Sequence, residues 1–164
     1  MENNEELIKN DPKIKEDRLR FTKNKIPSWL CYLAIVFDVI YFIGVYKINH
    51  EYFYTGMIAV SIIANLIFML GVFLSSEEVK NYKLSYAIVM LVFAAMQIAR
   101  IFIYPYNAYI TQGNDGAYVI EMPMFLFLAA MLSCSAISLI VGGIIGILKS
   151  RKHKKAVADA QAAK

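Results

Sequence analysis

Two residues with full formal charges, Asp38 and Arg100, stand inside long apolar stretches of the sequence. A charged side chain at membrane depth is costly, so it usually has a partner or a function. A lone carboxylate at that depth could relay protons or cations across a membrane. A carboxylate paired with a guanidinium could instead clamp two helices together, and the pairing would oppose proton carriage because it keeps the carboxylate charged.

Helix geometry sets the heights of these two charges. Asp38 lies thirteen residues after Lys25, and Arg100 lies seventeen after Lys83, which places them about 20 Å and about 25 Å along their helices. The offset is within reach of an arginine side chain. We therefore expect the Asp38 face to meet the Arg100 face, which also carries Gln97, with an assembly clamp as the leading interpretation. There are two alternatives. Arg100 extends alone to the outer membrane interface, or Asp38 relays protons or cations.

Other polar and small residues suggest contacts between helices. Asn65 stands in the second apolar stretch and is expected to hydrogen-bond another helix. In the fourth stretch small residues recur every four positions, at Ala130, Cys134, Ser138, Gly142 and Gly146. Small residues at this spacing let a second helix approach closely. The neighbour is either another helix of the same bundle or a second copy of the chain.

Four apolar stretches must position these residues. They cover about 27–47, 55–75, 84–104 and 123–148, and each is long enough to cross a hydrocarbon core of about 30 Å as a helix. Hydrophobic residues make up 59% of the 164 residues and charged residues 18%, which is unlike a soluble domain. The stretches are continuous, without the alternation of a β-barrel. We predict an all-α integral membrane protein with a four-transmembrane-helix bundle.

The basic residues predict an orientation. Fifteen of the 17 lysines and arginines lie before the first stretch, between the second and third, or after the fourth. The positive-inside rule then places both termini in the cytoplasm of a multi-pass plasma-membrane protein. This divides the chain into a basic arm at 1–26, a membrane domain at 27–148 and a basic tail at 149–164. Both basic segments suit the anionic lipids of the inner leaflet. Since the membrane accounts for their charge, we expect no nucleic-acid partner.

The second outer loop, residues 105–122, contains no lysine or arginine. Two β-prone runs, AYIT and AYVIE, flank a QGNDG turn, a pattern that predicts a small β-hairpin on the membrane surface. The tyrosines on this side fit the ordinary aromatic belt or a platform for a partner.

No catalytic constellation is apparent. Cys31 and Cys134 form no CxxC pair, and His50 and His153 fall on opposite sides of the predicted membrane. GxxxxGK[ST], HExxH and GxSxG motifs are missing, so we expect no enzyme, cofactor or metal. The favoured function is a small accessory or scaffold subunit that binds another membrane protein or forms a homo-oligomer. The alternative is a small oligomeric proton- or cation-coupled transporter that uses Asp38.

Overall fold

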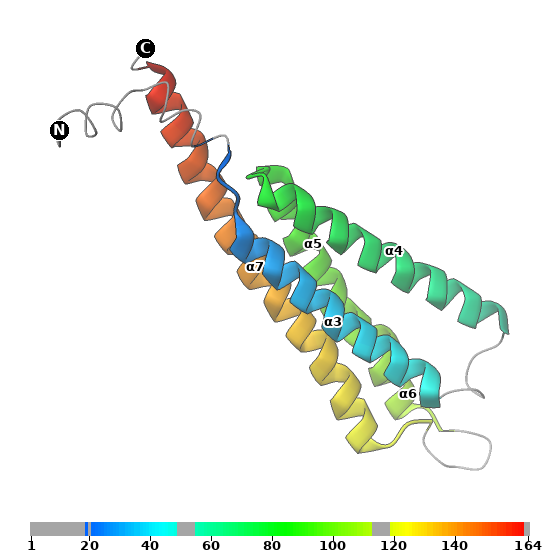
Figure 1. Cartoon of the computed structure of the whole chain (residues 1–164). Coiled ribbons are helices and arrows are strands. Elements are labelled where there is room, and N and C mark those ends of the chain that lie inside the picture. The colour runs from blue at the N-terminus through cyan, green and yellow to red at the C-terminus, as the bar shows by residue number, and fades with distance from the viewer. Residues whose placement is uncertain (1–18, 20, 49–54, 113–118, 163–164) are drawn as a thin grey trace, which may run out of the picture.

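The computed structural model describes residues 19, 21–48, 55–112 and 119–162. Within these residues the elements are helices joined by short turns and loops, without strands. Four helices are long and apolar enough to cross a membrane, as predicted (Figure 1). They are α3 (Lys25–Ile48), α4 (Thr55–Lys80), α5 (Leu84–Ile101) and α7 (Met122–Ala162). Pro27 and Pro123 stand in the first turns of α3 and α7, where a backbone N–H has no partner within the helix in any case.

The predicted hairpin is wrong in its first arm. The chain continues from α5 into the π-helical turn η1 (Phe102–Tyr106), which contains the buried Pro105, and then into α6 (Asn107–Ile110). A proline removes one helical hydrogen bond, and a local π-helical turn lets the helix continue past it. The β-propensity of AYIT is a weak, context-dependent preference, and helical continuity prevails over it. Residues 113–118, which include most of the predicted turn, lie outside the described residues.

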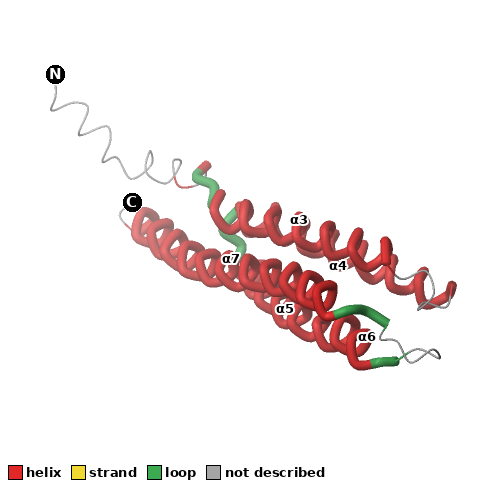
Figure 2. Tube along the Cα trace, turned by 90° about the horizontal axis from the view of Figure 1, so that it is seen from below, coloured by secondary structure: helices red, strands yellow, loops and turns green. Residues whose placement is uncertain are grey.

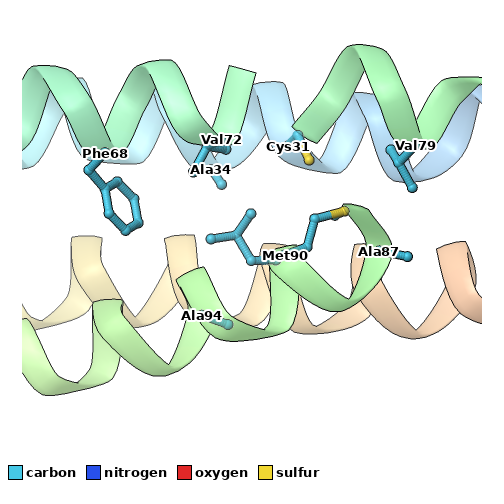
Figure 3. Packing of buried hydrophobic residues seen from close by; sticks show 9 residues of the cluster. Cys31, Ala34, Phe68, Val72, Val79, Ala87, Met90 and Ala94 are labelled. Atoms are coloured by element: carbon cyan, nitrogen blue, oxygen red, sulfur yellow. The ribbon is translucent and has the colours of Figure 1, made fainter. Parts of the chain in front are cut away.

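The helices pack into a bundle whose two ends differ. We call the end that contains residues 81–83, between α4 and α5, the turn end, and the opposite end the α6 end. At the turn end all four long helices contribute to one core (Figure 3). The members of this core are Cys31, Ala34, Phe68, Val72, Val79, Ala87, Met90, Ala94 and Leu139. The small side chains in this core, on α3 and α5, allow both helices to pack closely against α7.

The core at the α6 end consists of Tyr41, Val45, Ala108, Ile120, Leu128 and Leu132. None of its members lies on α4, among the side chains that the structure describes. Figure 1 shows the reason, because α4 moves away from α3 and α6 towards its first residue. The bundle therefore has a four-helix core at the turn end and a three-helix core at the α6 end.

Helix α7 is much longer than a membrane crossing. Its 41 residues correspond to about 60 Å, about twice the thickness of the hydrocarbon core. It runs past the predicted span end at residue 148 and projects beyond the turn end (Figures 1 and 2). The described part of the basic tail is thus a helical extension of the fourth span.

His153 on this extension contacts two other segments at the turn end. Its ring stacks on Tyr82 with centroids 4.1 Å apart and an interplanar angle of 10°. Its Nε2 atom lies 2.9 Å from the carbonyl oxygen of Leu19. Tyr82 has a positive φ of 58°, an uncommon backbone conformation for a residue other than glycine. The His153 contacts connect the extension, the α4–α5 turn and the segment that precedes α3.

Candidate functional site

A buried polar network lies at the level of Asp38. The Asp38 side chain is in α3 and the residue is only 3% exposed. Its Oδ1 atom accepts a hydrogen bond from Nε2 of Gln97 on α5, and its Oδ2 atom accepts one of 3.3 Å from Oγ of Ser135 on α7. Both carboxylate oxygens of Asp38 therefore have donors from other helices.

Gln97 is the centre of the network and is completely buried. Its Nε2 atom carries two hydrogens, which serve Asp38 and Oγ of Ser135, the latter at 2.8 Å. Its Oε1 atom accepts a hydrogen bond of 2.8 Å from Nη1 of Arg100. An amide suits this position because it donates and accepts at the same time. Gln97 thereby joins the carboxylate and the guanidinium, whose charges are opposite.

The Arg100 guanidinium links α5 to α3 and α4. Its Nη1 atom lies 3.6 Å from Oδ1 of Asp38, with the arginine side chain 19% exposed. Its Nη2 atom donates a hydrogen bond to Oδ1 of Asn65 on α4. The guanidinium also lies over the rings of Tyr41 and Phe68, 5.0 Å and 5.1 Å from their centroids. Cation–π contacts of this kind stabilise a cation that has left water.

The network includes side chains from all four long helices. A buried polar group without a partner is costly, whereas a network with its partners in place fixes how the helices sit relative to each other. Helices in a membrane lack a strong hydrophobic drive to associate, so polar contacts and close packing hold them together. This arrangement can set the register and rotation of the four spans, and it leaves the Asp38 carboxylate enclosed.

The structure brings the predicted polar residues Asp38, Asn65, Gln97 and Arg100 into one cluster. Ser135 was missed by the sequence analysis. A signal for it exists in the sequence, because Ser135 falls on the same helical face as the apolar Leu128, Leu132 and Leu139, at the spacing i, i+4, i+7, i+11. The serine on this apolar face would have pointed to a contact inside the bundle.

The small-residue series on α7 does not form one face. Ala130 is exposed and Cys134 is half-buried, whereas Ser138, Gly142 and Gly146 are buried. A strict spacing of four residues turns by about 40° at each step around a helix with 3.6 residues per turn. Over the whole series this drift is about 160°, so its first and last members point in very different directions.

The two glycines pack inside the bundle. A Cβ atom at Gly142 would lie 2.6 Å from Cε of Met90 and 3.2 Å from Cβ of Leu30. At Gly146 it would lie 3.0 Å from both Cβ of Ala87 and Cγ2 of Val79. Glycine thus allows α7 to approach α3, α4 and α5 within the same chain.

Among the described residues, no group of three histidine, cysteine, aspartate or glutamate side chains could hold a metal ion. Cys31 and Cys134 are free cysteines.

No protein-family model, curated protein or solved structure matches this chain.

Proposed function

We propose that this chain is a non-enzymatic accessory or scaffold subunit of the plasma membrane. It crosses the membrane four times with both termini in the cytoplasm, and it binds another membrane protein or a second copy of itself. The basic residues support the orientation, because 15 of the 17 lie in segments assigned to the cytoplasmic side. The same residues favour contact with anionic lipids of the inner leaflet.

The enclosure of Asp38 is the observation that carries the scaffold proposal. A transport carboxylate has to release and rebind its ion on both sides of the membrane. Asp38 is 3% exposed, and Gln97 and Ser135 donate to its two oxygens. Arg100 supplies the neutralising charge 3.6 Å away. These contacts favour a structural clamp, in which the charge positions helices and does not move ions.

Proton flux into proteoliposomes distinguishes the scaffold from the alternative transporter. We expect vesicles with the wild-type protein and with Asp38→Asn to show the same slow acidification as empty vesicles, followed with an internal pH dye. A flux that depends on the wild-type protein and disappears in Asp38→Asn would reassign the chain to proton-coupled transport.

The size of the native complex tests the scaffold function directly. Gently solubilised native membranes should contain the chain in a particle larger than the purified monomer. A chemical crosslink between this chain and its partner, either another membrane protein or a second copy, should preserve that particle in harsher detergent. If the chain migrates as a lone monomer from native membranes with and without crosslinker, the scaffold proposal is wrong.

A further inference from the structure

An aromatic and basic surface lies at the turn end, where α3 and α4 run side by side (Figure 1). On each helix three residues follow the spacing i, i+4, i+7, which places them on one face. We call this surface the α3–α4 patch, and it consists of Lys25, Trp29, Tyr32, Phe73, Glu77 and Lys80.

The aromatic part of the patch is open to its surroundings. Trp29 is 70% exposed and Phe73 is 45% exposed. Tyr32 lies between them, with its ring centroid 6.1 Å from that of Trp29 and 6.3 Å from that of Phe73. Exposed tryptophan and tyrosine at the end of a membrane span belong at the level of the lipid headgroups.

The charged part of the patch is held in place by Glu77. Its Oε1 atom accepts a hydrogen bond of 2.5 Å from the Tyr32 hydroxyl. The Lys80 ammonium lies 3.4 Å from the Glu77 carboxylate, and Lys23 is among the charges that act on that carboxylate. Lys25 is exposed one helical turn before Trp29. Lys23 and Lys80 together outweigh the single charge of Glu77. Lys25, exposed on the face of α3 that carries Trp29, adds a further positive charge beside the aromatic rings.

From this charge balance and position we propose that the α3–α4 patch binds the phosphate of an anionic phospholipid. Lys25 and Lys80 contact the phosphate, and Trp29 and Phe73 contact the glycerol and the first part of an acyl chain. Tyr32 and Glu77 are positioning residues, because they join α3 to α4 and hold Lys80 at the edge of the aromatic surface. This lipid site rests on the proposed membrane embedding of the four helices.

The test uses the full chain in detergent, titrated with phosphatidylglycerol, with bound lipids counted by native mass spectrometry. One lysine near an anionic lipid contributes about 1 kcal/mol, which corresponds to about a fivefold change in affinity. We expect the double variant Lys25→Gln/Lys80→Gln to weaken phosphatidylglycerol binding about 25-fold. Trp29→Leu, added to the double variant, should weaken this binding further. Melting curves without lipid check that each variant remains folded.

The matched control is Lys154→Gln/Lys155→Gln, which removes the same charge from exposed positions on the α7 extension. We expect this control to bind phosphatidylglycerol like the wild type. Phosphatidylcholine and inorganic phosphate, tested on the wild type, should bind far more weakly than phosphatidylglycerol.

Three results would overturn the lipid site. Equal loss of binding in the two double variants would mean a general charge effect. Equal binding of phosphatidylcholine would remove the role of the lipid's charge, and tight binding of inorganic phosphate would mean an ion site without a lipid. None of these results affects the size of the native complex, so failure of the lipid site and failure of the scaffold function can be told apart.

Discussion

Gln97 is the residue on which the buried network depends most. It contacts Asp38, Ser135 and Arg100 through one side-chain amide. Removal of this amide leaves a buried carboxylate and a guanidinium each with one partner fewer. The remaining groups cannot recover hydrogen bonds from water at this depth, so the loss falls on the stability of the helix bundle.

Gln97→Leu is expected to lower the free energy of unfolding by about 2 kcal/mol, since a hydrogen bond between membrane helices contributes about 0.6–1.7 kcal/mol. Unfolding in a mild detergent titrated with a denaturing one measures this change. Met96→Leu is the control, because Met96 is the exposed neighbour on the same helix and should be nearly neutral. Equal stability of Gln97→Leu and wild type would show that the network contributes nothing to the fold.

A double-mutant cycle on Asp38 and Arg100 measures whether the two charges form a clamp. We expect Asp38→Asn and Arg100→Gln each to destabilise the protein by about 3 kcal/mol, at the low end for a buried pair because Arg100 is 19% exposed. The double variant should recover part of the loss, because no unpaired charge remains. Additive losses, with coupling below about 0.5 kcal/mol, would contradict the clamp.

The depth of these residues along their helices could be predicted from the sequence. The rotation of each helix about its own axis could not. Counting residues from Lys25 and Lys83 placed Asp38 and Arg100 at similar depths, and the structure puts them 3.6 Å apart. The count does not say which side of α7 faces them. The position of Ser135, and the choice of Asn65 as a second partner of Arg100, depend on how each helix is turned about its axis.

At the scale of the helices, α7 makes the most extensive contacts, with α3 and α5, whereas α4 packs mainly on α3 and α5. Gly142 and Gly146 allow close contact with the neighbouring helices, whereas Ile144 between them is exposed. The apolar pattern correctly predicted four helices that are long and apolar enough to cross a membrane. It could not predict the continuation of α5 through η1 and α6, because the sequence cue at Pro105 is ambiguous between a helix end and an interrupted helix.

Leucine at Gly142 or Gly146 should destabilise the bundle, because the new side chain has to displace Met90, Leu30, Ala87 or Val79. Overpacking of this kind typically costs about 1–3 kcal/mol. A lowered melting temperature in detergent should be seen for both glycine variants, and Ile144→Leu should melt like the wild type. Unchanged melting of the glycine variants would show that α7 does not need this close approach.

At the scale of the whole molecule, the segments that carry the basic charge come together at one end of the bundle. The segment before α3, the α4–α5 turn and the α7 extension meet at the turn end through His153, Tyr82 and Leu19. These are the segments that carry most of the basic residues. The described basic residues of these segments therefore lie at one end of the bundle, which faces the cytoplasm in the proposed orientation.

Cysteine labelling tests this orientation. With Cys31 and Cys134 replaced by alanine, a cysteine at Asn114 should react with a membrane-impermeant reagent on intact cells. A cysteine at Lys154 should react only after permeabilisation, because the positive-inside rule keeps the basic end in the cytoplasm. The reverse labelling pattern would invert the topology and place the α3–α4 patch in the outer leaflet.

The span of the buried network along the chain has a consequence for synthesis. Asp38 is 59 residues before its partner Gln97 and 97 residues before Ser135. At translation rates of about 5–20 residues per second, Asp38 is made roughly 3–12 s before the Gln97 amide that donates to its carboxylate and the Arg100 guanidinium that balances its charge. During that interval α3 and α4 hold Asp38 without Gln97, Arg100 and Ser135, so the network closes only once Ser135 of α7 has been made, 97 residues after Asp38.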